Sequence, residues 1–260
     1  MPFFFFMLLC MFSCNSNAGN QWATAPVIKN DFSLINPYST ISAIPVPAGF
    51  SRMQTDSGSY AEWLRQLPLK KNKTVYLFNG FPKSNQTAQF AVIDISTGDK
   101  DLQQCADAVM RLRAEYLYGQ KRYASIDFTD NNRTHYRLPI GANRILFNQY
   151  LEKVFSYCGT ASLYNQLKPV TDFKKIEAGE VLIKGGAPGH AMQVMDIAVN
   201  SEGKRLYLLA QSYMPAQDMH VVINPANSRF SPWYEADDQA IIATPEWRFI
   251  KPCLKQWPAY

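Results

Sequence analysis

The sequence predicts an α+β fold, with helices in the first half packed on a mainly antiparallel sheet or half-barrel in the second half. Apolar residues recur at helical spacing up to about residue 167, whereas strand-length apolar segments follow one another from residue 178 onward. Short connections between consecutive strands indicate antiparallel pairing, and no internal repeat is visible. The chain has 260 residues, 47% of them hydrophobic, and we predict a single globular domain over residues 51–260.

The N-terminus has the pattern of a leader. MPFFFFMLLCMF contains an apolar run of roughly ten residues, the size of a signal-peptide hydrophobic region and too short to cross a bilayer. Ser13 and Cys14 follow it, an order that resembles a bacterial lipoprotein cleavage site with Cys14 as the lipidated residue. We therefore predict a signal peptide over residues 1–14 and an exported, periplasmic or outer-membrane-associated lipoprotein. The alternative is an uncleaved hydrophobic leader.

Residues 15–50 carry four prolines among Asn, Ser and Thr, which predicts an extended tether that leads from the membrane and ends by packing on the domain. The net charge of +5 is mild and its basic residues are scattered, so we expect no nucleic-acid partner. Beyond the leader, Cys105, Cys158 and Cys253 form no CxxC pair, which excludes a zinc ribbon and leaves at most one disulfide. We predict no metal and no cofactor, and the oligomeric state stays undetermined.

Four segments have the spacing of helices. Residues 59–67 form a short amphipathic pattern that stops at Pro68. The clearest pattern covers residues 99–121, where Cys105, Val109 and Leu112 lie on one apolar stripe. Residues 144–157 form a second long helix, and residues 160–167 continue beyond Gly159 as a short helical piece.

Strands are predicted on both sides of these helices. In the first half, β-branched and aromatic runs bounded by turn residues cover residues 74–80, 89–95 and 123–128. In the second half, residues 180–184, 190–200, 204–213 and 218–224 follow as a meander.

The turns of this meander set its register. The predicted pairs are Val199 with Lys204, Met192 with Gln211, His190 with Tyr213, and Gln211 with His220. One face of the sheet then carries His190, Gln211, Tyr213 and His220, with Gln211 diagonal to His190 at roughly 7 Å. Asp196 lies on the same predicted face but roughly 20 Å along the strand, so it cannot orient His190. A one-residue slip would move Gln211 to the other face.

A histidine with a polar neighbour can serve as the base for a nucleophilic cysteine. Cys158 is the candidate nucleophile, because it lies near the start of the helical piece at 160–167 and a helix N-terminus lowers the pKa of a thiol. Ser162 is a weaker alternative. The simpler interpretations are a half-buried His190 at a strand start and a Cys158 that only fills the core. The glycines at 185, 186 and 189 precede a strand, so they form a tight turn or a loop that a substrate approaches closely.

The order of these residues resembles the papain-like cysteine amidases of bacterial cell walls, of the NlpC/P60 and CHAP type. The similarity covers residues 156–213, and GEVLI at 179–183 and His190 correspond well. It implies a papain-like topology, with Cys158 as nucleophile, His190 as base and Gln211 as the residue that orients the base.

The chain also resembles an uncharacterised family of Bacteroidota lipoproteins, a domain-of-unknown-function family. The similarity covers most of the mature chain and implies an exported lipoprotein without an established activity. The blocks that carry it are CADAVMRLRAEYLY (105–118), GTASL (159–163), PGHAMQVMDIA (188–198), LLAQSYMPAQDMHV (208–221), SPWYE (231–235) and TPEW (244–247).

Two functions are compatible with the sequence. The first is a cysteine amidase or peptidase that acts on peptidoglycan peptides at the cell envelope. The second is a non-catalytic envelope lipoprotein that binds a glycan or peptide, with Trp233, Tyr234 and Trp247 as stacking surfaces. In either case the predicted substrate-binding residues are Gly189, Tyr213, His220 and Trp233. A metal site shared by His190 and His220 is disfavoured because two strand spacings separate them by roughly 10 Å.

Overall fold

The structure is a computed structural model that describes residues 34–250 and 253–258. These residues belong to one compact unit, which spans residues 33–260. The predicted signal peptide, its Cys14 and residues 15–33 of the predicted tether lie outside the described residues. In the described ranges, no helix combines the length and the apolar character needed to span a membrane.

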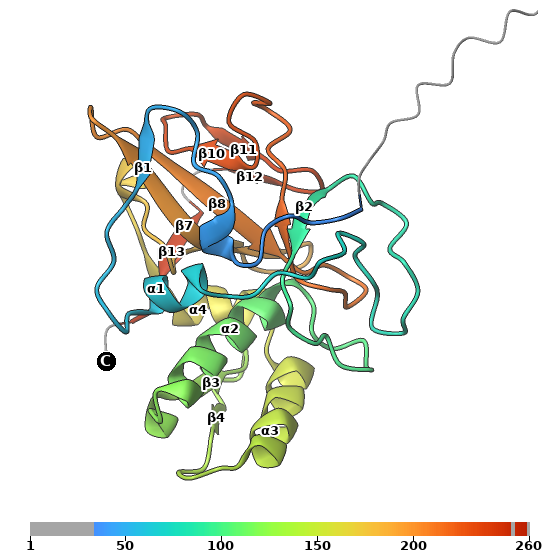
Figure 1. Cartoon of the computed structure of the whole chain (residues 1–260). Coiled ribbons are helices and arrows are strands. Elements are labelled where there is room, and N and C mark those ends of the chain that lie inside the picture. The colour runs from blue at the N-terminus through green and yellow to red at the C-terminus, as the bar shows by residue number, and fades with distance from the viewer. Residues whose placement is uncertain (1–33, 251–252, 259–260) are drawn as a thin grey trace, which may run out of the picture. The chain divides into compact units, whose positions relative to one another are not determined.

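The described part of the chain holds four α-helices, three short 3₁₀ turns and thirteen strands (Figure 1). The helices and turns are η1 (Ile41–Ala43), α1 (Tyr60–Arg65), α2 (Cys105–Gly119), η2 (Tyr123–Ser125), α3 (Arg144–Tyr157), α4 (Thr160–Gln166) and η3 (Phe173–Lys175). The strands are β1 (Phe50–Arg52), β2 (Gln89–Val92), β3 (Asp127–Thr129), β4 (His135–Arg137), β5 (Lys168–Pro169), β6 (Val181–Lys184), β7 (His190–Asn200), β8 (Arg205–Gln211), β9 (His220–Val222), β10 (Trp233–Glu235), β11 (Ile241–Ala243), β12 (Arg248–Ile250) and β13 (Leu254–Gln256).

One nine-stranded sheet organises the unit. Its order is β2-β9-β8-β7-β6-β13-β5, with β1 added to β7 and β10 added to β8. Every pairing in this sheet is antiparallel, which confirms the predicted strand direction. The sheet is not confined to the second half, because β1 and β2 join it from residues 50–52 and 89–92.

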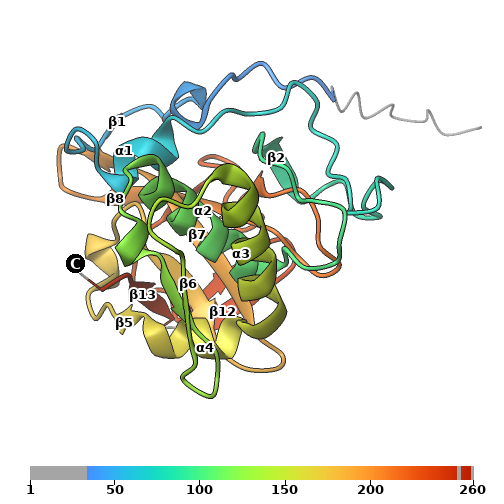
Figure 2. The same cartoon turned by 90° about the horizontal axis from the view of Figure 1, so that it is seen from below.

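The helices are less segregated than predicted. Helix α3 begins and ends at the predicted residues, but α3 and α4 both follow residue 143 and therefore lie in the second half of the chain. Figures 1 and 2 show α1 and α2 on one side of β7. The predicted strand at 123–128 begins as the 3₁₀ turn η2 and becomes a strand only at β3, from Asp127, and the predicted strand at 74–80 makes only isolated bridges.

Two apolar clusters cover the two faces of the central strands. On one face, Ala191 and Met195 of β7 join a large core with the helices. On the other face, Met192 and Val194 pack with Ile242 and Phe249 of the β11–β12 hairpin. Residues 34–50, predicted as tether, contribute to the first core, because Ile41 and Ile44 are fully buried in it. The folded unit therefore begins before residue 51.

A β-bulge corrects the predicted register of β7 and β8. Near the turn, Val199 pairs with Arg205 rather than Lys204, and the register shifts between Val194 and Asp196. Beyond the shift Gln193 pairs with Ala210, which is the register predicted for the His190 end. The bulge turns Asp196 to the helix side, where it binds Arg52 and Arg65, so the prediction that it shares the face of His190 is wrong.

Candidate functional site

His190 is the first residue of β7 and is 1% exposed. Aromatic rings surround it: the ring centroids of Tyr213, Trp247 and Phe249 lie 4.9, 5.2 and 5.9 Å from its imidazole. Trp247 and Phe249 come from the β11–β12 hairpin, which is why the meander alone could not place them. The imidazole is therefore held in a nearly dry environment with one edge toward a pocket.

The predicted partner Gln211 is in contact with this imidazole. His190 Nε2 lies 2.8 Å from Gln211 Oε1, and Gln211 is fully buried at the end of β8. Gln211 also pairs with His220 of β9 in the predicted register. Strand alternation places these side chains on one face, and the bulge between Val194 and Asp196 restores the register that the turn alone would have shifted by one residue.

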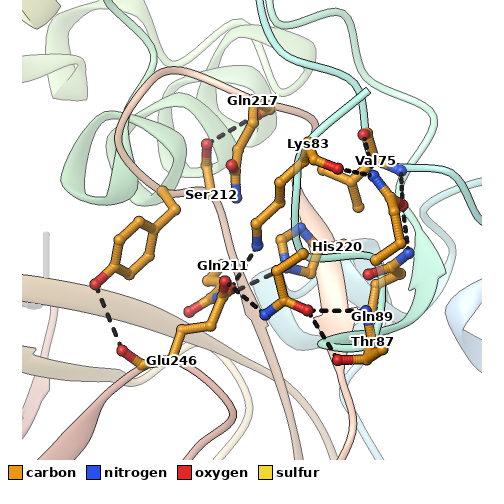
Figure 3. Close-up of polar contacts among 12 residues, drawn as sticks. Val75, Lys83, Thr87, Gln89, Gln211, Ser212, Gln217, His220 and Glu246 are labelled. Atoms are coloured by element: carbon orange, nitrogen blue, oxygen red, sulfur yellow. Dashed lines mark hydrogen bonds and ion pairs between the residues drawn. The ribbon is translucent and has the colours of Figure 1, made fainter. Parts of the chain in front are cut away.

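A second layer of polar side chains lies behind Gln211 (Figure 3). Gln211 Nε2 donates to Glu246 Oε2 at 2.8 Å and lies 3.4 Å from His220 Nε2. Glu246 Oε2 also binds Lys83 Nζ at 2.5 Å, and Glu246 Oε1 accepts from Asn85 Nδ2 at 3.1 Å. His220 Nδ1 lies 2.9 Å from the carbonyl oxygen of Asp218, an acceptor, so Nδ1 carries the proton.

Burial dominates the electrostatics of both histidines. It lowers the pKa of His190 to about 4, opposed by the hydrogen bond to Gln211 and the carboxylate of Glu246. Burial also lowers the pKa of His220, and the ammonium of Lys83 adds to that effect. Both imidazoles are therefore neutral at neutral pH.

A pocket of about 450 Å³ opens beside His190. Its lining includes Cys105 and Asp107 at the start of α2, Cys158 at the end of α3, and Tyr213 and Trp247. A second pocket of about 470 Å³ shares Gly186 and Trp247 with the first, so the two together offer room for an extended ligand.

Cys105 is a second thiol in this pocket, and it lies beside the start of β7. It is the first residue of α2 and is partly exposed, and the backbone N–H of Ala191, the residue after His190, lies close enough to its sulfur to stabilise the thiolate. Burial raises the pKa of this thiol, while the N–H groups of Ala191, Ala106 and Cys105 itself oppose that rise. Helix α2 packs directly on β7, and this packing brings the start of the helix to the start of the strand.

Cys158, the thiol predicted as nucleophile, is in a less suitable position. It is buried, and the side chain that stabilises its thiolate is that of Ser162 rather than that of His190. Burial raises the pKa of the thiol to about 12, and the carboxylates of Asp107 and Asp130 add to the effect. The predicted benefit of a helix N-terminus is offset because Cys158 also caps the carbonyl end of α3, where negative charge is disfavoured.

Asp107 brings a carboxyl group to the pocket. Its Oδ2 accepts from the backbone N–H of Gln104 at 3.0 Å, whereas no partner for Oδ1 is found within residues 34–250 and 253–258. Burial raises the pKa of Asp107 well above its ordinary value. A buried carboxyl oxygen without a partner is costly, so this atom is a candidate acceptor for a ligand.

The four predicted substrate-binding residues separate into two pairs. Gly189 and Tyr213 line the pocket. Gly189 is also required by packing, because an added Cβ would lie 2.2 Å from the carbonyl oxygen of Gly186 and 2.4 Å from Oγ1 of Thr160.

Trp233 and His220 do not line the pocket, and their assignment as substrate-binding residues is corrected. Trp233 is 1% exposed and donates from Nε1 to the carbonyl oxygen of Pro45 at 2.8 Å, so residues ahead of the domain boundary cover it. His220 is fully buried behind Gln211. Within the described residues no group of three or more His, Cys, Asp or Glu side chains is arranged to hold a metal ion.

Sequence reasoning missed Cys105, Lys83 and Glu246. Cys105 was assigned to the apolar stripe of a helix predicted from residue 99, which hid its position at a helix start. The acidic Asp107 was an available signal for a start at residue 105, because acidic side chains favour the first turn. Nothing local pointed to Lys83 or Glu246, since each acts through contacts more than thirty residues away.

Comparisons with known proteins identify a family but no activity. The model of a family described as "Domain of unknown function (4846)" matches residues 41–139 and 130–256, which is more than half of the chain. No curated protein matches. No solved structure matches either.

Proposed function

This chain belongs to the family described as "Domain of unknown function (4846)", and from its own residues we propose that it is a papain-like cysteine amidase or peptidase. In this proposal Cys105 replaces Cys158 as the nucleophile, His190 is the base and Gln211 orients the base. The single observation that carries it is the junction of α2 and β7. There a thiol at a helix start lies beside Ala191 and lines the same pocket as His190, whose Nε2 is bound to Gln211.

The hydrogen bond to Gln211 supports a base at Nδ1 of His190. A carboxamide oxygen accepts, so the Nε2 that contacts Gln211 Oε1 carries the imidazole proton. In the described part of the chain Nδ1 has no hydrogen-bond partner, and its lone pair is free to take a proton. The raised pKa of Cys105 and the lowered pKa of His190 make the resting pair a neutral thiol and a neutral imidazole.

The reaction follows from this protonation state. As the Cys105 sulfur attacks the carbonyl carbon of an amide, its proton passes to Nδ1 of His190, and negative charge develops on the carbonyl oxygen. The first N–H groups of a helix lack intrahelical partners, so those at the start of α2 can stabilise this charge. The imidazolium then gives its proton to the leaving amine as the carbon–nitrogen bond breaks. Water then attacks the thioester as Nδ1 accepts a proton from it, the carbon–sulfur bond breaks, and the imidazolium returns that proton to the sulfur of Cys105, which releases the carboxylic acid.

The charges in the pocket support a substrate with an amino group near the scissile bond. Asp101 and Asp107 line the pocket, and no Lys or Arg is among the described residues that line it. The unpartnered Oδ1 of Asp107 is suited to an N–H donor, and an ammonium group would favour its ionised form. Stem peptides of peptidoglycan have amino groups of this kind, so they are the proposed substrate class.

We further propose an exported lipoprotein anchored through Cys14. The support is the apolar leader that ends at Ser13-Cys14. Labelling of expressing cells with a palmitate analogue, with Cys14→Ala as the control, tests this proposal.

The decisive test for the enzyme is site-resolved alkylation. Purified protein is treated with iodoacetamide from pH 4 to pH 9, and the modified cysteines are identified by mass spectrometry. We expect Cys105 to react faster than Cys158, and we expect His190→Ala to slow Cys105 at least about tenfold at neutral pH. Incubation with purified stem peptides, with and without prior alkylation, then tests for release of a new amine. An unreactive Cys105 would remove the catalytic proposal.

One observation favours the alternative of a non-catalytic peptide or glycan receptor. Burial raises the pKa of Cys105, and the aromatic rings of Tyr213 and Trp247 offer stacking surfaces beside it. Under this alternative stem peptides bind to the Cys105→Ala variant and to the wild type alike, and neither protein releases an amine.

A further inference from the structure

We infer that Glu246, held by Lys83, is a positioning residue that fixes the tautomer of His190 through the carboxamide of Gln211. The inference rests on the proposed function for its catalytic consequence, whereas the tautomer itself is independent of any activity. Glu246 lies in the turn between β11 and β12 and has no direct hydrogen bond to His190 among the described residues.

The orientation of a glutamine amide is decided by its neighbours, because its oxygen and nitrogen ends have nearly the same shape. Gln211 lies between His190 on one side and Glu246 on the other. A carboxylate only accepts hydrogen bonds, so the amide must present its NH₂ group to Glu246. Its oxygen then faces His190, and Nε2 of that imidazole must donate.

Lys83 keeps Glu246 an acceptor. Its ammonium lies 2.5 Å from Oε2, the same carboxylate oxygen that accepts from Gln211, and Lys83 is 8% exposed. The segment that carries Lys83 is fixed by Gln86, whose Nε2 donates to the carbonyl oxygens of Val75 at 2.9 Å and of Lys83 at 2.7 Å. The ion pair is therefore a built feature and not a chance surface contact.

The arrangement has a direct chemical meaning. When Nε2 holds the proton, the Nδ1 lone pair is free to receive the proton of Cys105. The opposite amide orientation would place NH₂ against Nε2, and the imidazole would then hold its proton on Nδ1. In that tautomer His190 could not act as the base, and loss of the correct histidine tautomer in a Ser-His-Asp triad lowers kcat by about 10⁴-fold.

Three variants separate this role from simple packing. Glu246→Gln keeps an oxygen acceptor that can face both Lys83 and Gln211, so it retains the tautomer. Glu246→Ala leaves the Lys83 ammonium without its carboxylate, and the oxygen of Gln211 turns toward that cation. Lys83→Met combined with Glu246→Ala removes the cation as well, and His220 Nε2, 3.4 Å from Gln211 Nε2, then favours the original orientation.

The experiment reads the imidazole directly. Long-range ¹H–¹⁵N spectra of the full chain distinguish Nε2–H from Nδ1–H, and His190→Gln identifies the His190 signals. We expect Nε2–H in the wild type, in Glu246→Gln and in the double variant, and Nδ1–H in Glu246→Ala. Alkylation of Cys105 is expected to be at least about tenfold slower in Glu246→Ala alone.

The outcomes distinguish the proposed role of Glu246 from the proposed enzymatic activity. An Nδ1–H tautomer in the wild type, or an unchanged Nε2–H in a folded Glu246→Ala, would overturn the role of Glu246. The expected tautomer pattern with an unreactive Cys105 would support the role of Glu246 and reject the enzyme. If Glu246→Ala loses its circular dichroism, the comparison of Glu246→Gln with Lys83→Met decides: only Lys83→Met is expected to show a weakened Gln211–Glu246 contact and a mixed tautomer.

Discussion

Two buried polar side chains of strand β7 are His190 at its start and Asp196 nearer its end. They differ in how many of their hydrogen-bonding atoms already have partners. Asp196 accepts from Nε of Arg52 at 2.7 Å and from Nε and Nη2 of Arg65 at 2.9 and 2.6 Å, and its Oδ1 also accepts from the N–H of Ile197. Among the described residues, His190 at the other end has a hydrogen-bond partner only at Nε2, and its side chain lines a pocket that Cys105 also lines. We call the Asp196 side of the strand the saturated end, because both carboxylate oxygens have partners. We call the His190 side the open end, because one imidazole nitrogen has none among the described residues.

This difference distinguishes a structural centre from a chemical one. The buried carboxylate of Asp196 links β1 and α1 to the sheet through two ion pairs. Both of its oxygens already have partners, so neither is left to bind a ligand. A neutral imidazole that is oriented on one side and open on the other can exchange a proton. Burial alone therefore does not indicate function, since Asp196 is fully buried and His190 is nearly so.

The largest expected effect is at the open end. Cys105→Ala removes the proposed nucleophile, so hydrolysis of stem peptides should fall by about 10³-fold or more. Amine release measured by mass spectrometry checks this result. The matched control is Cys158→Ala, which lines the same pocket and should keep most of the activity. Loss of activity in Cys158→Ala alone, at unchanged stability, would restore Cys158 as the nucleophile.

The next largest effect is at the saturated end. Asp196→Ala leaves the guanidinium groups of Arg52 and Arg65 without their carboxylate, and we expect a loss of about 3 kcal/mol in the free energy of unfolding. Urea denaturation measures it. The rate of Cys105 alkylation under native conditions should stay unchanged, so a slower reaction would mean that the two ends are coupled.

The pH dependence should come from the open end. Burial lowers the pKa of His190 to about 4, so the base form persists down to that pH and the rate of hydrolysis should decline only as the pH falls through about 4. The unfolded chain binds this proton near pH 6.5, so the same group lowers stability as the pH falls from about 6.5 to about 4. Initial rates and urea midpoints across pH 3.5–8 measure both effects. A decline of the rate centred near pH 6.5 would contradict a buried base.

The smallest effect concerns the aromatic cover. Trp247→Ala removes a ring whose centroid is 5.2 Å from that of His190, which admits water and should raise the pKa of the imidazole toward its ordinary value. The acid limb of Cys105 alkylation should then move to higher pH. Tyr234→Phe, a substitution away from the pocket, serves as the control and should leave that limb in place.

Much of the fold could be predicted because the relevant signals are local. The antiparallel meander, helix α3 over Arg144–Tyr157 and the pairing of Gln211 with His220 all follow from residue spacing and turn length. The register near Val199 was wrong, because a bulge changes alternation without a strong mark in the sequence. The first-half strands were overestimated, because apolar and aromatic runs there pack as loops with isolated bridges.

The sequence by itself determined that His190 opens a strand and that Gln211 ends the next one, since both depend on the two-residue period of a strand. That the two side chains meet also depends on the bulge between Val194 and Asp196, which offsets the one-residue error in the register at the turn. Only the tertiary structure decided which cysteine meets this histidine. That choice depends on how α2 packs on β7, a contact between residues 105 and 191 that no local pattern encodes. Only the tertiary structure likewise showed that Lys83 and Glu246 lie behind Gln211, because their buried ion pair joins segments that are distant in the chain.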